Sequence, residues 1–487
     1  MASDAVNGGA HFTVPLIING KEVITSTTFP VISPSSKKEI WSSSSAGKEE
    51  AIAAIEAAEA AFPSWSRTKP SERRDIFLRA ANILEKRADE AKQIMQDETG
   101  AVANFTGFNL MTTVEQLRDI AGRIVVSLSG TIPVSQTEGT SALILKEPFG
   151  VIFSIAPWNA PFILGQRAIS YAIAVGNTAV LKGSEMSPRC FQLISQCFQE
   201  AGLPGGVLNV IYTRPQDAAE VTKACIEAPQ VKKITFTGST AVGSVIAELG
   251  GKSLKPVVME LGGKASAIVC DDAELDHAAF QCALGAFIHS GQVCMSTERI
   301  LVHESILESF SKALTKAINI LGQGASDSPI LISPVGVKKN HELINGAVNG
   351  GAKILHGDIN IKETTDTRMR PIVVSGVTPE MDLYHKESFG PSVSLIAISS
   401  DDEAVKIAND TDYGLSGAVF TKDLVRGLRI AKSIETGAVH INGMSVHDEP
   451  NLPHGGAKKS GFGRFNGQQG MDEFLRTKVV TFLGVDL

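Results

Sequence analysis

Cys294 is the cysteine whose surroundings best suit a nucleophile. It follows a Ser-Gly-Gln-Val segment at 290–293, a break after the apolar stretch Phe280–His289. A reactive cysteine needs exposure and a lowered pKa, which loops near helix ends supply. The alternative is a buried structural thiol. The remaining cysteines form no CxxC pair and no metal-ligand spacing, so we expect free and mostly buried thiols at positions 190, 197, 225, 270 and 282.

Glu260 directly follows the apolar run Pro256–Met259. A carboxylate at the end of a buried run is unfavourable unless it is paired or functional. Burial would raise its pKa toward the range that suits a general base. The glycines at 262 and 263 would let ligand atoms approach the backbone. The alternatives are an ion pair with Lys264 or a helix N-cap role.

Asn159 lies between Pro157 and Pro161, which stiffen the loop around it. A rigid amide donor at the end of a strand is what stabilisation of an oxyanion requires. The alternative is an asparagine that only caps the following helix.

A strand-to-helix turn at Phe236–Gly243 could hold the pyrophosphate of a dinucleotide. Gly238 permits a tight turn, Ser239 adds a hydroxyl, and the helix N-terminus offers free N–H groups. The chain contains neither a GxGxxG motif nor a P-loop, which disfavours a nucleoside triphosphatase.

Lys182 and Glu185 follow the strand-like run Thr178–Leu181. A lysine and a carboxylate can hold ribose hydroxyls, and the carboxylate would repel the extra phosphate of NADP. This pattern favours NAD as the cofactor. The alternative is an exposed Lys–Glu pair that contributes ~0–1 kcal/mol.

A repeated β-α alternation between residues 150 and 270 positions these residues. Strand-like runs at 151–155, 178–181, 207–211, 233–236, 257–260 and 267–270 alternate with helix candidates near 162–174, 187–201, 216–227 and 240–250. The alternation predicts an α/β fold with a parallel sheet covered by helices. In such sheets ligands bind beyond the carboxyl ends of the strands, where the segments 157–159, 182–185, 237–243 and 260–263 lie.

Other segments complete the predicted organisation. A second α/β stretch, about 264–445, contains Cys294 and predicts a separate lobe. An amphipathic helix begins after Pro70, with Ser71 as its N-cap, and ends near Gly100. Strand-like runs at 124–148 and 478–484 would form an oligomerisation sheet by pairing with each other or with a neighbouring subunit. The alternative is an edge hairpin within one subunit.

Composition disfavours several classes of partner. The 487 residues are 43% hydrophobic and 20% charged, with a net charge of −7 and scattered Lys and Arg, so nucleic-acid binding is not indicated. No stretch approaches the ~20 apolar residues that span a bilayer, and the N-terminus does not resemble a signal peptide. We therefore expect a cytoplasmic protein with a small-molecule ligand. The side chains at 447–449 and 454 fit no standard metal spacing, so we expect no metal.

Seven motifs in order resemble those of the aldehyde dehydrogenase superfamily, from about residue 15 to the end. They are Pro157-Trp158-Asn159, Lys182-Gly183-Ser184-Glu185, Phe236-Thr237-Gly238-Ser239, Met259-Glu260-Leu261-Gly262-Gly263-Lys264, Gly291-Gln292-Val293-Cys294, Glu387-Ser388-Phe389-Gly390-Pro391 and the Gly455–Arg464 loop. The resemblance implies a Rossmann-like NAD-binding lobe (1–123 and 149–255), an α/β catalytic lobe (256–465) and a small oligomerisation β-sheet with the C-terminal segment (124–148 and 466–487). It also implies a homodimer or homotetramer.

The resemblance implies a role for each motif residue. Cys294 would be the nucleophile and Glu260 the general base, while the Asn159 side chain and the Cys294 backbone N–H would hold the oxyanion. The carboxylate at 260 implies hydrolysis of a thioester rather than transfer to coenzyme A. Gln292 has no role that the sequence explains. NAD would be held by Ile155, Pro157, Trp158, Lys182, Ser184, Glu185, Gly238, Ser239, Glu387 and Phe389.

The segment Pro157–Ile169 looks most like salicylaldehyde and benzaldehyde dehydrogenases, in which an arginine at the Arg167 position lines the substrate entrance. Arg167 lies eight residues after Asn159, roughly two helical turns, so both could border one funnel. Its guanidinium could hold a phenolic oxygen or a carboxylate, and the alternative is a structural ion pair. Ala160 would leave room for a ring, so we expect an aromatic aldehyde.

Two rival interpretations stay open. One is an NADP-linked, semialdehyde-specific, aliphatic or biosynthetic-pathway aldehyde dehydrogenase. The other is a non-catalytic scaffold, which the presence of Cys294, Glu260 and Asn159 disfavours.

Overall fold

Five parallel strands form the centre of the first lobe. The computed structural model describes residues 12–321 and 328–484. From one side of the sheet to the other, the parallel strands are β11 (Val257–Glu260), β10 (Val231–Thr237), β7 (Val151–Ile155), β8 (Thr178–Lys182) and β9 (Leu208–Ile211). Antiparallel strands extend both edges: β21 (Gly461–Phe462) beside β11, and β2 (Leu16–Ile18) with β3 (Lys21–Val23) beside β9. The predicted α/β class is confirmed.

The strand order of this sheet reverses between β7 and β10. The chain runs from β7 through β8 to β9 on one side, then returns to β10 and β11 on the other side. At such a reversal the loops that leave the two central strands diverge and open a crevice at their carboxyl ends. The loops after β7 and β10 carry Asn159 and Gly238, so both predicted motifs reach this crevice.

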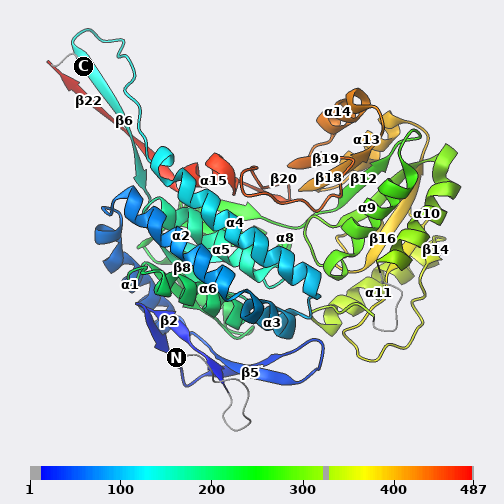
Figure 1. Ribbon diagram of the computed structural model, residues 1–487, viewed down its shortest axis with the longest axis horizontal. Helices are drawn as coiled ribbons and strands as arrows, with labels where there is room; N and C mark the ends of the chain where they lie inside the picture. The colour runs from blue at the N-terminus through cyan, green and yellow to red at the C-terminus, as the bar shows by residue number, and fades with distance from the viewer. Residues whose placement is uncertain (1–11, 322–327, 485–487) are drawn as a thin grey trace.

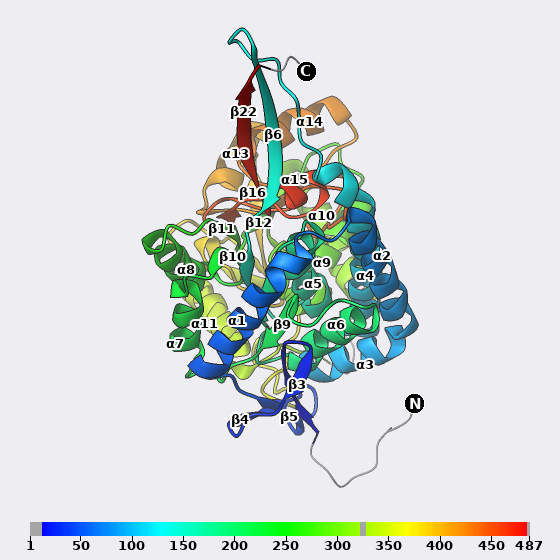
Figure 2. The ribbon, with the colours of Figure 1, turned by 90° about the vertical axis from the view of Figure 1, so that its left-hand side faces the viewer.

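Helices cover both faces of the first sheet, with α7 and α8 on one side and α2, α4 and α6 on the other (Figure 2). The inner layer on the second side is α5, which packs against the sheet and beneath α4. The helices are α1 (Lys48–Trp65), α2 (Pro70–Lys86), α3 (Ala88–Thr99), α4 (Ala103–Ser127), α5 (Pro161–Ala174), α6 (Pro188–Glu200), α7 (Ala218–Glu227) and α8 (Thr240–Lys252).

The single long helix predicted after Pro70 is two helices. Pro70 is the first residue of α2 and Lys69 is the N-cap residue, so the predicted N-cap at Ser71 is wrong. The fixed φ of proline suits the first helical position, which displaces the cap by two residues. At Arg87 the backbone leaves helical geometry (φ −94°, ψ 17°) and separates α2 from α3. Gly100 ends α3 in the left-handed conformation, where the helix was predicted to end.

A second, mostly parallel sheet forms the other lobe (Figure 1). Its order is β14 (Lys353–His356), β15 (Ile372–Ser375), β16 (Ser392–Ile398), β13 (Thr297–His303), β12 (Ala265–Val269), β18 (Ser416–Phe420) and β19 (Ala438–Ile441), with only β14 antiparallel. Its helical elements are α9 (Leu275–Phe287), η1 (Ile288–Gly291), η2 (Glu304–Ile306), α10 (Leu307–Ile320), α11 (Pro334–Asn349), α12 (Asp382–His385), α13 (Asp401–Asn409) and α14 (Leu424–Ser433).

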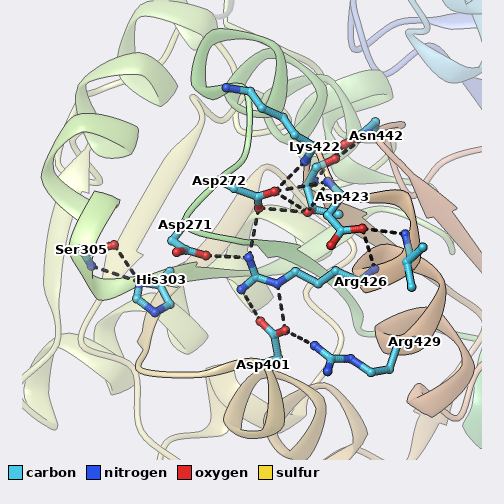
Figure 3. Close-up of polar contacts among 12 residues, drawn as sticks. Asp271, Asp272, His303, Ser305, Asp401, Lys422, Asp423, Arg426, Arg429 and Asn442 are labelled. Carbon is cyan, nitrogen blue, oxygen red and sulfur yellow. Dashed lines mark hydrogen bonds and ion pairs between the residues drawn. The ribbon is translucent and has the colours of Figure 1, made fainter.

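A charged network closes the carboxyl edge of the second sheet. Arg426 on α14 contacts Asp271 at 2.7 Å and Asp272 at 3.1 Å, both of which follow β12, and Asp401 at 2.6 Å (Figure 3). These charge-assisted contacts satisfy the polar groups of this edge with one another. The opposite, amino edge carries Cys294, immediately before β13. The usual carboxyl-edge rule therefore locates the ligand crevice only in the first sheet.

A long two-stranded antiparallel ribbon projects from the body of the protein (Figures 1 and 2). β6 (Thr140–Pro148) and β22 (Leu475–Leu483) pair antiparallel along their whole length. The prediction that these two segments pair with each other is confirmed. Smaller elements are α15 (Gly467–Asp472), the sheet β1 (Thr13–Val14), β5 (Glu39–Ser44), β4 (Thr28–Ile32) and the pair β17 (Tyr413–Gly414) with β20 (Ala457–Lys458).

Strand pairing moves several of the predicted lobe boundaries. Residues 124–127 are the last turn of α4 rather than strand, and 467–472 form α15. β11 and β21 lie in the first sheet, although the boundary predicted at residue 256 assigned them to the catalytic lobe. Hydrogen bonds between β10 and β11, and between β11 and β21, decide this placement, which no local pattern reveals. Within the described ranges, no helix is both long and apolar enough to cross a membrane.

Candidate active site

Cys294 lies in the wall between two cavities. One cavity, of about 260 Å³, is lined by the loops after β7 and β10 together with Glu387 and Phe389. The other is narrower, about 30 Å³, and mostly apolar; it lies against α4 and α5. The residues that line both cavities are Asn159, Leu164, Glu260 and Cys294. The three predicted catalytic residues therefore lie together in the wall that the two cavities share.

The segment before Cys294 adopts an uncommon backbone conformation. His289 and Ser290 have φ values of 48° and 59°, and Gly291 continues the left-handed run with φ 70°. A side chain on Gly291 would place Cβ 2.1 Å from the carbonyl oxygen of Gly390, so only glycine fits there. This turn leaves Cys294 half-buried, while the other five cysteines are free and buried as predicted.

Gln292 anchors the loop that carries Cys294, a role that sequence reasoning missed. Its side-chain amide donates to the carbonyl oxygens of His289 (3.1 Å) and Ile330 (3.2 Å) and accepts from the N–H of Ile332 (2.9 Å). Its backbone carbonyl accepts a hydrogen bond from Nδ2 of Asn159 at 3.0 Å. One residue thus fixes both the loop and the amide that faces the cavities.

The Asn159 side chain bonds to the loop that carries Cys294 rather than capping a helix. Ala160 is the N-cap residue of α5, so the capping alternative for Asn159 is wrong. An amide carries two N–H bonds. One is held by the Gln292 carbonyl, and Asn159 lines both cavities together with Cys294.

Glu260 belongs to a buried cluster of charged groups. Its Oε1 contacts Nε2 of His454, and its Oε2 lies 3.8 Å from Nη1 of Arg167. Lys264, the predicted alternative partner, pairs with Glu298 at 2.7 Å instead. No helix follows β11, which excludes the N-cap alternative. Gly263 lets this loop approach Cys294, because a Cβ there would lie 2.2 Å from the carbonyl oxygen of Cys294.

The pKa of Glu260 is lowered, contrary to the predicted rise. Burial favours the neutral acid, but the charges of His454 and Arg167 outweigh burial and lower the pKa. The sequence places these partners 194 and 93 residues away, so only desolvation could be anticipated. Burial, together with the negative charges of Glu260 and Glu387, raises the pKa of the Cys294 thiol well above its usual value. The thiol therefore needs a base to react.

Arg167 is buried and paired, so the structural ion-pair alternative is realised. Its Nη2 contacts the Asp448 carboxylate, whose side chain is only 5% exposed and also accepts from Nδ2 of Asn466 at 2.8 Å. The Nε of Arg167 is buried, and no described residue accepts a hydrogen bond from it. Arg167 and Ala160 both line the narrow cavity, as the substrate prediction requires.

The wider cavity gathers most of the predicted cofactor residues. Six of the predicted cofactor residues line it: Pro157, Trp158, Gly238, Ser239, Glu387 and Phe389. Ser239 is the N-cap of α8 and accepts from the N–H of Val242 at 3.4 Å, so the free N–H groups of this helix start at the cavity. Burial raises the pKa of Glu387 to about 7.

The four other predicted cofactor residues lie at the carboxyl ends of β7 and β8, outside the lining of this cavity. Ile155 pairs with Lys182 across the two strands, and Ser184 accepts from the N–H of Met186 at 3.2 Å. Lys182 is buried, which lowers its pKa, so it is not half of an exposed ion pair. Glu185 lines a separate cavity of about 500 Å³.

His454 and Asp448 are the site residues that sequence reasoning missed as partners. Both lie in the 447–454 segment, whose side chains fit no standard metal spacing and received no other predicted role. Within the described ranges, no group of His, Cys, Asp and Glu side chains could hold a metal ion. The sequence signal that could have indicated these two residues was the group of acidic and imidazole side chains next to the Gly455–Arg464 motif. Their targets, Arg167 and Glu260, are distant in sequence.

The chain belongs to the aldehyde dehydrogenase family, whose model matches residues 23–480. Among its relatives, vanillin dehydrogenase of a Pseudomonas species is 40% identical over 478 residues, covering 96% of this chain and 98% of the relative. Salicylaldehyde dehydrogenase of another Pseudomonas strain is 40% identical over 460 residues, covering 93% and 94%.

Solved structures share the whole fold. Salicylaldehyde dehydrogenase from Pseudomonas putida, complexed with salicylaldehyde, has a TM-score of 0.93 at 36% identity and covers 98% of this chain and 99% of its own. Betaine aldehyde dehydrogenase from Staphylococcus aureus, in complex with NAD+, has a TM-score of 0.92 at 28% identity, with 98% and 96% covered. The aldehyde dehydrogenase fold predicted from the motifs is confirmed.

Proposed function

We propose that this protein oxidises an aromatic aldehyde to the carboxylic acid with NAD, through a thioester on Cys294 that Glu260 helps to hydrolyse. The observation that carries the proposal is the position of Cys294, Asn159 and Glu260 in the walls of both cavities. A carbonyl group held in the narrow cavity would reach the thiol from one side. A nicotinamide ring in the wider cavity would approach from the other side.

In the first half of the reaction, the chain's residues generate and stabilise a tetrahedral adduct. The Cys294 thiol first loses its proton to a base from solvent, which yields the thiolate and leaves Glu260 as an anion for the second half. The thiolate sulfur attacks the aldehyde carbon, and the Asn159 amide and the Cys294 N–H donate to the oxygen that becomes negative. A bound NAD supplies the acceptor for the hydride that leaves this carbon.

In the second half, Glu260 takes a proton from water while the water oxygen attacks the thioester carbon. The carbon–sulfur bond breaks, its electron pair returns to Cys294, and the acid leaves. The lowered pKa of Glu260 keeps it ionised and ready to accept the proton at neutral pH.

Apolar side chains favour an aromatic ring in the narrow cavity. Phe105, Phe108, Ile163, Met295 and Val446 line it, and Ala160 leaves space at its wall. A ring is larger than the present 30 Å³, so binding must displace flexible side chains such as methionine, a common adjustment at binding sites.

The charges in the narrow cavity favour a neutral substrate. Asp448 already neutralises Arg167, and Glu260 adds a second carboxylate. A substrate carboxylate would be a third anion in this buried cluster, whereas a phenolic oxygen could accept from Nε of Arg167, which donates to no described residue. This comparison favours hydroxylated aromatic aldehydes over semialdehydes.

An aldehyde panel tests the function. With NAD, benzaldehyde and salicylaldehyde should give NADH with kcat/KM at least about 10-fold above succinic semialdehyde, because the carboxylate of the semialdehyde would be buried without a partner. Initial rates of NADH absorbance measure this, and heat-denatured protein sets the background. Absence of NADH with every aldehyde would contradict the proposal, and a preference for the semialdehyde would contradict the substrate class.

The choice of NAD rests on Glu185. Glu185→Ala should raise kcat/KM for NADP relative to NAD by about 10-fold, because a carboxylate beside the ribose repels an added phosphate. Steady-state rates with both cofactors measure the ratio. Glu220→Ala, which removes a surface carboxylate on α7, is the matched control. An unchanged ratio in the Glu185 variant would argue against this role.

We also infer a homo-oligomer. Val479 and Leu483 on β22 are 64% and 77% exposed, and the two-stranded ribbon that carries them projects from the body (Figure 2). Apolar side chains on an open strand edge favour pairing with another copy of the chain.

A further inference from the structure

Glu260, Arg167, Asp448 and His454 form one buried cluster beside the nucleophile. They come from three separate parts of the chain: the end of β11, the middle of α5 and the segment after β19. The side chains of Arg167 and Glu260 are 2% and 1% exposed, and those of Asp448 and His454 are 5% and 9% exposed. All four line the narrow cavity.

The charges of this cluster sum to zero when both carboxylates are ionised and the imidazole is protonated. Two carboxylates and one guanidinium leave a net charge of −1, and an uncompensated charge is strongly disfavoured in a buried cluster. A proton on His454 brings the sum to zero. In this contact Nε2 of His454 faces a carboxylate oxygen and must carry a hydrogen to donate to it, as it does in the imidazolium, where both ring nitrogens are donors.

We propose that His454 is a positioning residue for the hydrolytic step: its protonated imidazole donates from Nε2 to Oε1 of Glu260, holds the carboxylate as an anion and leaves Oε2 to accept the proton of the attacking water. This inference rests on the proposed function, in which Glu260 is the base. Oε2 of Glu260 accepts no hydrogen bond from any described residue, so it is the oxygen with a vacant lone pair.

The step balances without another reactant. An O–H bond of water breaks and its proton goes to Oε2, while the electron pair stays on the oxygen and forms the new bond to the acyl carbon. The carbon–sulfur bond then breaks with its pair on Cys294. His454 keeps its proton throughout, so it acts on the reaction only through Glu260.

The charged groups around Glu260 set the expected pH dependence. The cations are His454 and Arg167, and the anion facing them is Asp448, with the Cys294 thiol across the cavity. Loss of the His454 charge removes one of the two groups that hold the Glu260 pKa down. The carboxyl then takes up its proton at a higher pH. The acid limb, the fall of the hydrolytic rate toward low pH, therefore shifts to a higher pH.

Two variants at His454 separate charge from hydrogen bonding. His454→Phe removes both, whereas His454→Gln keeps a neutral donor. His447→Gln is the matched control, because His447 contacts Glu449 at 2.7 Å and lies outside the two cavities. The readouts are the size of the first burst of NADH, the steady rate, and the pH profile of the steady rate, with benzaldehyde and NAD.

For His454→Phe we expect a retained burst, a steady rate about 10- to 100-fold lower, and an acid limb about 1 pH unit or more higher. His454→Gln should recover much of the plateau rate yet keep the raised acid limb. The inference is overturned if the acid limb stays in place in His454→Gln, or if burst and steady rate fall together in both variants. A wild-type protein that forms no NADH with any aldehyde would instead refute the proposed function.

Discussion

Replacing Cys294 with alanine should abolish NADH formation from every aldehyde that the wild-type protein oxidises. We expect a loss of at least about 10⁴-fold, equivalent to ~5.5 kcal/mol of transition-state stabilisation. Among the described residues no other thiol lines either cavity, so no second sulfur can replace it. Both the burst and the steady rate should disappear, because the thiolate attack precedes hydride transfer. Stopped-flow absorbance of NADH measures both.

Cys197→Ala provides the control for loss of a thiol. Cys197 is buried in α6, away from both cavities, and burial raises its pKa to about 12. This variant should keep its burst and its steady rate. Mass spectrometry of rapidly quenched enzyme should find the acyl adduct on the wild type and on Cys197→Ala, but not on Cys294→Ala. Oxidation that persists without the Cys294 sulfur would refute the thioester mechanism.

Replacing Glu260 with glutamine should separate the two halves of the reaction. The steady rate should fall about 10²- to 10⁴-fold, the usual contribution of a general base, while a burst of NADH remains. The Glu260 anion is one cause of the raised pKa of Cys294. Its removal lowers that pKa, so the thiolate forms at lower pH without help from the carboxylate. Burst amplitude and steady rate, followed in one stopped-flow trace, measure the separation.

A strong nucleophile tests the same prediction chemically. Hydroxylamine attacks a thioester without needing a general base, so it should restore turnover to Glu260→Gln and give the hydroxamic acid. Wild-type turnover should change much less. If burst and steady rate fall together, or if hydroxylamine restores nothing, Glu260 acts before hydride transfer rather than in hydrolysis.

Local sequence was sufficient for the residues that follow strands. Asn159 after β7, Glu260 at the end of β11 and Gly238 after β10 were all predicted at the crevice, and the structure brings them there. These positions depend on the alternation of apolar strands and amphipathic helices, which is a local pattern. Cys294 was found differently, from a glycine-containing break and from the order of the family motifs.

The surroundings of these residues depend on contacts between segments far apart in the chain. Arg167 meets Asp448 from 281 residues away, and His454 meets Glu260 from 194 residues away. The sign of the Glu260 pKa shift was therefore wrong from sequence, because only burial was visible and not the two cations that outweigh it. The ion pair expected with Lys264 failed for the same reason.

The order of apolar and polar residues along the chain was thus enough to specify the α/β class, the parallel sheet and the loops that carry the chemistry, since strand and helix periodicity is a short-range property. It could not specify that the amino edge of the second sheet would face the crevice of the first. Nor could it specify which charged side chains would surround Glu260. Those features arise only when the two lobes pack, because electrostatic interactions act through space and are strongest where packing has excluded water.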